Sequence, residues 1–154
     1  MTSSNELPRH SVSVTGVVVR SDGKILAIKR EDDGRWVPPG GVLELAETPQ
    51  ECVMREVLEE TGVKVQPVRL IGVYKNMKLG VVSMAFLCTP VDGKPHTTDE
   101  ATDVAWVSPS EATEAMPEAR AVRVTDAFRS GGPFVRVHDG NTLLDPAEVH
   151  RAAD

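Results

Sequence analysis

A short stretch of the 154-residue chain gathers carboxylates at helical spacing. Glu56, Glu59 and Glu60 are neighbours when the stretch is drawn as a helix, and Arg55 directly precedes them. Repulsion among these carboxylates would destabilise an isolated helix, and Glu59 and Glu60 would lie at the end of the helix dipole that disfavours anions. A solvated charged surface therefore explains the pattern poorly. Grouped oxygen ligands predict a site for a hard divalent cation such as Mg²⁺.

The residues just before this stretch extend the same candidate site. Glu44 and Glu47 continue the acidic cluster toward the N-terminus. Pro39 is followed by Gly40 and Gly41, and a backbone without side chains can offer a carbonyl ligand or approach a phosphate closely. A plain turn is the alternative interpretation of the two glycines.

A helix over residues 49–61 is expected to position the carboxylates. Thr48 and Glu51 form the pattern of a capping box, which predicts where the helix begins. Gly62 suits the residue that ends a helix. On a helical wheel, the arc expected to face the core holds Val53, Met54, Val57, Leu58 and Thr61. The opposite arc holds Cys52, Arg55, Glu56, Glu59 and Glu60.

The remaining pattern predicts an α/β protein of the α+β type, with helices packed on a mixed β-sheet. Strands are expected at residues 12–19, 25–28, 65–75, 79–89, 104–107 and 134–137, and helices from residue 108 and over 118–129. The first two strands are expected to form a hairpin, with Gly16 as a candidate bulge. The strands at 65–75 and 79–89 are expected to be antiparallel. One face of the helix over 118–129 is expected to hold Ala121, Val122, Val124, Thr125 and Phe128.

Length and composition describe an ordinary globular protein. Residues 1–10 are polar and are expected to form a flexible arm, and residues 11–154 are expected to form a single domain. Hydrophobic residues make up 40% of the chain and charged residues 26%. The formal net charge of −6 disfavours binding to a nucleic-acid polymer.

The cysteines and the apolar runs bear on where the protein works. Cys52 and Cys88 are far apart and have no neighbouring ligand pattern, so we expect buried thiols rather than a zinc site or a disulfide. The N-terminus lacks the apolar core of a secretory signal, and no run is long enough to span a membrane. These features predict a cytoplasmic protein.

The stretch Gly41–Val63 reads Gly-x5-Glu-x7-Arg-Glu-Val-x-Glu-Glu-x-Gly-Val and resembles the Nudix box, Gx5Ex7REUxEExGU, at every specified position. The preceding residues 36–41 look like the Trp-x-x-Pro-Gly-Gly sequence that leads into the box. Residues 103–107 are similar to the strand that follows the family's late acidic loop. The resemblance covers roughly residues 12–128.

Membership of this family would imply an α/β/α sandwich around a mixed β-sheet. It would also imply hydrolysis of a P–O–P bond in a nucleoside diphosphate derivative, with Mg²⁺ as cofactor and Mn²⁺ as a possible substitute. Carried over by position, Glu59 and Glu60 resemble the principal metal ligands and Glu56 a third. Glu47 resembles a supporting carboxylate, and Arg55 resembles the residue that holds these glutamates in place. Either Gly40 or Gly41 would supply a carbonyl ligand.

The general base is not fixed by the resemblance. In the family it is either a glutamate of the box, here Glu56 or Glu47, or a glutamate in the late loop. Glu100 is the candidate in that loop, where it could also complete the metal coordination, and a surface carboxylate is the alternative interpretation. His96 is a second candidate in the same loop.

The sequence constrains the identity of the substrate less than it constrains the type of reaction. The signatures of the NADH, ADP-ribose and coenzyme A enzymes are absent, which leaves a MutT-like scaffold with a (deoxy)nucleoside triphosphate as the default. Alternatives are ADP-ribose, a nucleotide sugar, a dinucleoside polyphosphate, or a regulatory module that binds a nucleotide without cleaving it. The expected partner is a small-molecule nucleotide, and a homodimer is possible. Arg129, Arg136 and His138 are candidates to reach a phosphate or a second subunit, and for the arginines an ordinary solvated surface is the favoured alternative interpretation.

Overall fold

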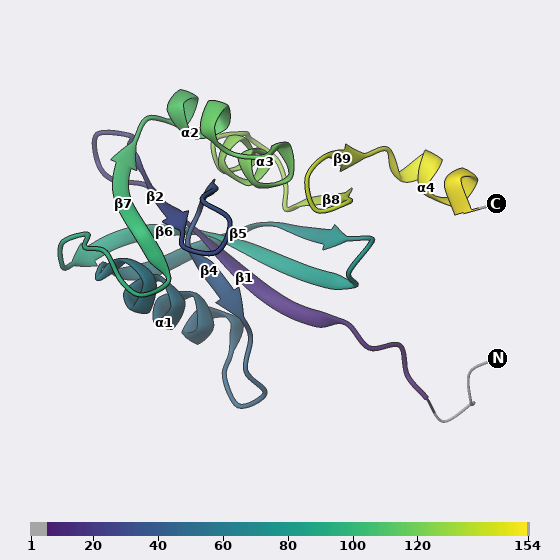
Figure 1. Ribbon diagram of the computed structural model, residues 1–154, viewed down its shortest axis with the longest axis horizontal. Helices are drawn as coiled ribbons and strands as arrows, with labels where there is room; N and C mark the ends of the chain where they lie inside the picture. Colours follow the sequence, from purple (N-terminus) through teal and green to yellow (C-terminus); the bar gives the residue numbers. More distant parts are fainter. Residues whose placement is uncertain (1–5, 154) are drawn as a thin grey trace.

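The computed structural model describes residues 6–153, with side chains placed as far as residue 149 (Figure 1). The strands are β1 (Ser11–Val18), β2 (Ile25–Arg30), β3 (Trp36–Val37), β4 (Gly40–Val42), β5 (Lys64–Asn76), β6 (Val81–Asp92), β7 (Ala101–Val107), β8 (Phe134–His138) and β9 (Leu143–Leu144). The helices are α1 (Pro49–Thr61), α2 (Pro109–Ala115), α3 (Glu118–Ala127) and α4 (Pro146–Ala153). Within residues 6–153, no helix is long and apolar enough to cross a membrane.

The elements form a mixed α+β fold built on two sheets. A six-stranded sheet has the order β4-β1-β6-β5-β8-β9, and a three-stranded sheet has the order β3-β2-β7. The larger sheet is mixed, because β1 and β6 are parallel whereas β5 and β6 are antiparallel. Helix α1 covers one side of this sheet, and α2 and α3 lie on the other side (Figure 1). The predicted fold class is confirmed.

The predicted hairpin between the first two strands is wrong. β1 and β2 share a single bridge, between Val19 and Ile25, and then enter different sheets. Both strands have a buried stretch, residues 14–18 in β1 and 25–28 in β2, and each has a neighbour on both sides: β4 and β6 for β1, β3 and β7 for β2. The chain does turn between β1 and β2, but pairings with strands far away in the sequence decide which strands become neighbours in a sheet.

Alternate residues of β1 feed two separate cores. Val14 and Val18 pack with α1, whereas Val17 packs with residues of α2 and α3. Gly16 is not a bulge, since the pairing of β1 with β6 runs through it without a break. A Cβ at Gly16 would lie 2.9 Å from a methyl group of Val57 and 3.0 Å from one of Val53, so this glycine lets α1 pack closely on the sheet.

The expectation for the N-terminal arm stays a prediction, and the expectation for α3 is wrong in part. Residues 1–5 lie outside the described residues, while residues 6–10 are exposed without regular secondary structure, so the flexible arm and the single-domain division stay predictions. Phe128, expected on one face with Ala121, Val122 and Val124, follows the last residue of α3 and is 51% exposed, whereas the other three are buried. Arg123 and Asp126 are buried instead. Arg123 lies against the larger sheet and donates to Thr15 and Ser83, and Asp126 contacts Tyr74 of β5 and Arg136 of β8.

The chain after α3 is fastened by one buried carboxylate, that of Asp126. It accepts hydrogen bonds from the Tyr74 hydroxyl at 2.9 Å and from Nε and Nη2 of Arg136, both at 2.7 Å. Arg129 contributes a longer contact of 3.4 Å. His138 is buried and accepts the Gly140 N–H at its Nδ1. Arg136 and His138 are therefore engaged within the fold, whereas the Arg129 side chain is 56% exposed and engaged only in part. That these groups reach a phosphate or a second subunit stays a prediction.

We expect Asp126→Asn to lower the stability of the protein by roughly 3–5 kcal/mol, because it leaves buried donors and the Arg136 cation without their anion. The melting temperature, measured by calorimetry, should fall by about 10 °C or more. Asp22→Asn is the matched control, since Asp22 pairs with Arg20 at an exposed position and its loss should change the melting temperature little. Equal small shifts for the two variants would contradict a clamp at Asp126.

Candidate active site

Helix α1 begins and ends as predicted. Thr48 and Glu51 form a capping box, and Gly62 adopts a left-handed conformation at the end of the helix (φ 80°). The predicted core face is wrong in part: Leu58 is 47% exposed, while Cys52 is fully buried and Glu60 is only 6% exposed. The helix is thus turned so that a glutamate lies against the sheet, next to β4.

Glu60 is a buried carboxylate with little compensation for its charge. The Gly40 N–H donates to its Oε1 at 3.0 Å, and no cationic side chain among the described residues forms an ion pair with it. The pKa of Glu60 is raised to about 8, mainly by burial; the Gly40 hydrogen bond opposes this shift, and the nearby carboxylates of Glu56 and Glu100 add to it. The position favours either a proton or a bound cation.

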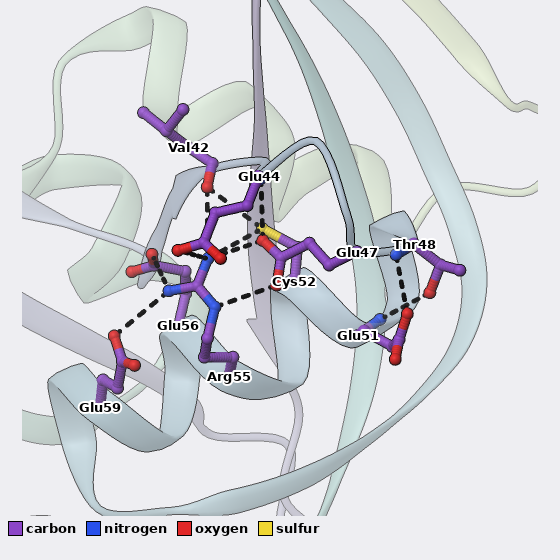
Figure 2. Close-up of polar contacts among 9 residues, drawn as sticks. All are labelled: Val42, Glu44, Glu47, Thr48, Glu51, Cys52, Arg55, Glu56 and Glu59. Atoms are coloured by element: carbon purple, nitrogen blue, oxygen red, sulfur yellow. Dashed lines mark hydrogen bonds and ion pairs between the residues drawn. The ribbon is translucent and has the colours of Figure 1, made fainter.

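Arg55 holds three of the other glutamates in place (Figure 2). Its Nε and Nη2 donate to the two oxygens of Glu47, at 3.0 and 2.7 Å. Its Nη1 donates to Glu56 at 2.7 Å and to Glu59 at 3.3 Å, and Glu44 lies 3.7 Å away as an ion pair. The hydrogen bond from Arg55 holds the pKa of Glu47 down at about 2, so Glu47 stays ionised. The expected pairing of Arg55 with box glutamates is present in the structure.

Gly41 brings the backbone of β4 against the Glu56 side chain. A Cβ at Gly41 would lie 2.3 Å from Cδ of Glu56 and 2.5 Å from one of its oxygens, so only glycine leaves room. Burial raises the pKa of Glu56, while Arg55 opposes this shift. The two glycines thus have different contacts, because Gly40 donates to Glu60 and Gly41 makes space for Glu56.

Gly41→Ala is expected to reduce kcat by roughly 10- to 50-fold, because the new methyl group must push the Glu56 carboxylate away from its present position. The side chain of Glu56 can move, so the melting temperature should change little. Steady-state kinetics and calorimetry on the same preparation check this prediction. Leu45→Ala, at an exposed residue outside the cavity, serves as the control and should retain activity; a fully active Gly41→Ala variant would show that the position of Glu56 is unimportant.

The loop before β7 is fastened to the C-terminal end of α1. The His96 N–H donates to the Thr61 carbonyl at 2.9 Å, and the Thr98 hydroxyl donates to the Glu60 carbonyl at 3.3 Å. These contacts satisfy carbonyl groups that a helix end leaves free. They place Glu100 close enough to Glu60 and Glu56 to raise the pKa of both carboxylates.

A cavity of about 630 Å³ joins these elements. Five of its lining carboxylates come from α1 and the loop before β7: Glu56, Glu59, Glu60, Asp99 and Glu100. Gly40 and Gly41 also line it, which brings the predicted site residues together apart from Arg55 and Glu47, which stand behind the lining. His96 does not line the cavity; its ring lies against Gly62 at the helix end.

Several lining residues escaped the sequence analysis. Glu31 and Asp32 belong to a segment that the sequence indicates only as a turn, although its charge was a usable signal. Arg120 of α3 also lines the cavity, and no local pattern marks it. Neither Trp36 nor Trp106 lines it: Trp36 packs against the core, and Trp106 lies under the guanidinium of Arg20.

The cysteines are buried and unpaired, as predicted. The Cys52 thiol donates to the Val42 carbonyl at 3.5 Å, and burial raises its pKa to about 12. Burial likewise raises the pKa of Cys88 to about 12. Neither group is poised as a nucleophile.

The donor set suits a divalent cation, although it is not gathered around one point. Glu60 is a buried carboxylate without a cationic partner, beside Glu56 and a cavity rich in oxygen atoms. Among the residues whose side chains are described, no three His, Cys, Asp or Glu groups already converge as a metal site. The contacts from Arg55 explain this, since they draw the Glu56 and Glu59 carboxylates toward the guanidinium.

The class of protein follows from comparison with known families. The family model described as NUDIX domain matches residues 9–128, so the chain belongs to the Nudix family. The chain is therefore a hydrolase that acts on nucleoside diphosphate derivatives, and hydrolases of this family generally use divalent metal ions.

Individual relatives agree with this assignment. The chain is 53% identical to a MutT-like protein of Streptomyces ambofaciens over 137 aligned residues. The alignment covers 89% of this chain and 89% of the relative. It is 36% identical over 98 residues to an ADP-ribose pyrophosphatase of Methanocaldococcus jannaschii, covering 59% of this chain and 57% of the relative. Its fold is similar to the crystal structure of a NUDIX hydrolase from Nitrosomonas europaea, with a TM-score of 0.74 and 23% identity over 86% of this chain and 79% of that one.

Proposed function

We propose that the protein hydrolyses a P–O–P bond of a (deoxy)nucleoside triphosphate in a Mg²⁺-dependent reaction, with Mn²⁺ as a possible substitute. The observation that carries this proposal is the cavity lined by Glu56, Glu59, Glu60 and Glu100, in which Glu60 is buried without a cationic partner. Such a cavity accommodates a polyphosphate only when cations offset the repulsion between carboxylates and phosphates.

The proposed metal ligands are Glu56, Glu59 and Glu60, with a carbonyl of Gly40 or Gly41, and Glu100 completes the set or acts as base. A bound divalent ion would neutralise phosphate charge and lower the pKa of water. The Gly40 N–H orients one oxygen of Glu60 and leaves the other for a ligand. Arg55 restrains the positions of Glu56 and Glu59 through its hydrogen bonds.

Glu100 is proposed as the general base because it reaches the cavity from a separate loop. Its backbone is fixed on both sides, by the Glu31 N–H donated to its carbonyl and by the contacts of Thr98 with α1. Its side chain is exposed and free to accept a proton from water in the cavity. Glu56 is the alternative base within the box. Glu47 is the weaker alternative, because Arg55 occupies both of its oxygens and holds its pKa at about 2.

ADP-ribose is a second candidate substrate, favoured by the name of the archaeal relative. A nucleotide sugar or a dinucleoside polyphosphate has the same diphosphate linkage and would meet the same carboxylates. A regulatory module that binds a nucleotide without cleaving it is disfavoured, because all the acidic positions of the box are present and Arg55 holds three of them, Glu47, Glu56 and Glu59.

A phosphate-release screen tests the proposal. The panel holds deoxynucleoside triphosphates, ADP-ribose, a nucleotide sugar and a dinucleoside polyphosphate, each with Mg²⁺ and with EDTA. We expect turnover only with the metal ion, and most rapidly with a triphosphate. Preferred cleavage of ADP-ribose would move the substrate to the second candidate. Tight binding of a nucleotide without turnover would support the regulatory alternative.

A further inference from the structure

Helix α3 carries two arginines that the fold leaves without a carboxylate partner among the described residues. Arg123 is 1% exposed and donates to neutral hydroxyls, to Thr15 at 2.6 Å and to Ser83 at 3.2 Å. Its guanidinium lies 5.0 Å from the centre of the Tyr74 ring, and its buried Nε has no hydrogen-bond partner. Asp126, one turn further along, is occupied by other donors, among them Arg136.

Arg120, one turn before Arg123, lines the cavity. It is partly buried, and no side-chain hydrogen bond or ion pair engages it within the described part of the chain. The other lining arginine, Arg30, is neutralised by Asp32 through hydrogen bonds of 2.9 and 2.5 Å. Arg120 is therefore the lining cation that remains available to a ligand among the described residues.

The cavity is lined by groups of both charges from different elements. Of its seven carboxylates, five come from α1 and the loop before β7, and those of Glu31 and Asp32 come from the turn after β2. Arg120 comes from α3, on the other side of the larger sheet (Figure 1). Thr15, on β1 between them, lines the cavity and accepts the hydrogen bond from Arg123. The second guanidinium therefore stands directly behind the wall of the cavity and adds positive potential near Arg120.

Removing an unpaired guanidinium partly from water costs free energy, and an ion pair with a bound anion offsets that cost. The chain has more acidic than basic residues, with a formal net charge of −6. A shortage of carboxylates therefore does not explain why Arg120 has no carboxylate partner among the described side chains. Phosphate oxygens match the planar fork of a guanidinium and can accept two hydrogen bonds from it.

We propose that Arg120 is a specificity-determining residue that binds an anionic group of the substrate outside the two phosphates joined by the hydrolysed bond. This inference rests on the proposed function and deepens it. A nucleoside triphosphate has a third phosphate for Arg120, whereas the group beyond the diphosphate of ADP-ribose is a neutral sugar. Arg120 thereby selects a triphosphate chain over an uncharged terminal group.

The test compares dATP with ADP-ribose, so that the adenine base is the same, using Arg120→Gln, Arg120→Lys and the control Arg20→Gln. Arg20 is exposed and lies outside the cavity, paired with Asp22. For dATP we expect Arg120→Gln to raise KM roughly 10- to 100-fold with a smaller change in kcat, and Arg120→Lys to fall between it and the wild type. The effect on dATP should exceed that on ADP-ribose at least fivefold. Equal losses on both substrates would mean that Arg120 contacts the adenine base or the two phosphates that both contain, and would overturn the proposal.

A binding measurement separates this proposal from the proposed function. In calorimetric titrations with Mg²⁺, tripolyphosphate should bind Arg120→Gln at least about tenfold more weakly than it binds the wild type. The same substitution should weaken the binding of pyrophosphate by a smaller factor. Unchanged tripolyphosphate affinity would overturn the role of Arg120 even if the enzyme hydrolyses triphosphates. If no nucleotide is hydrolysed, the proposed function fails, and the titration still decides whether Arg120 binds the anion. Melting temperatures of the variants identify any that do not fold.

Discussion

Glu60→Gln is expected to lower kcat at least about 10³-fold while the metal-free protein keeps or gains thermal stability. The amide cannot replace the charge of a metal ligand, so the loss of activity follows from the proposed site. Stability does not fall, because the wild-type protein buries this carboxylate beside Glu56 and Glu100 without a cationic partner. Steady-state kinetics and calorimetry without divalent metal measure the two effects. Glu114→Gln is the control. Glu114 is exposed and lies outside the cavity, so its substitution should alter neither kcat nor the melting temperature.

The stability gain should depend on pH. Because burial raises the pKa of Glu60 to about 8 in the folded state, from 4.5, the folded protein holds this proton more tightly than the unfolded chain does. The stabilising contribution is complete below pH 4.5 and is lost as the pH rises through about 8. Metal-free Glu60→Gln should thus gain least over the wild type below pH 4.5 and most at about pH 8 and above, by several degrees in melting temperature. A variant that loses stability and activity together at every pH would assign Glu60 a structural role.

Glu100→Ala is expected to reduce kcat at least about 10²-fold, the low end for loss of a general base, with little change in melting temperature. The backbone contacts of the loop do not depend on the Glu100 side chain, since its carbonyl receives the Glu31 N–H and Thr98 makes the contacts to α1. The measurement is kcat at saturating Mg²⁺ together with a thermal scan.

Asp103→Ala is the matched control for Glu100→Ala. Asp103 lies three residues further along, on β7, and its carboxylate contacts only the adjacent Val104 N–H among the described residues. It should retain nearly full activity. If Glu100→Ala also keeps a near-normal kcat, Glu100 is not the base, and Glu56 becomes the first candidate within the box.

Local features of the site could be predicted from the sequence, because they depend on residues close together in the chain. The capping box of Thr48 and the left-handed end at Gly62 set α1 to within one residue. The spacing that places Arg55 beside Glu56 and Glu59 is a property of any helix.

Features that depend on distant parts of the chain were missed. The local turn after β1 is real, yet β1 pairs with β6, some seventy residues away, because burial on both faces requires neighbours that no local pattern names. Leu58 and Glu60 exchange their expected exposure, since the sheet and β4 decide which arc of α1 is covered. Arg120 carries no signal in sequence, and its importance appears only when α3 and α1 meet at one cavity.

Binding of Mn²⁺, followed by electron paramagnetic resonance during titration in the presence of a non-hydrolysable nucleoside triphosphate analogue, tests most directly whether the carboxylates of α1 hold the metal ion. We expect the wild-type protein to bind Mn²⁺ stoichiometrically, Glu114→Gln to behave in the same way, and Glu60→Gln to lose at least one ion or weaken its binding at least about tenfold. Equal Mn²⁺ binding by the wild type and Glu60→Gln would contradict a metal site at Glu60 and, with it, the proposed mechanism.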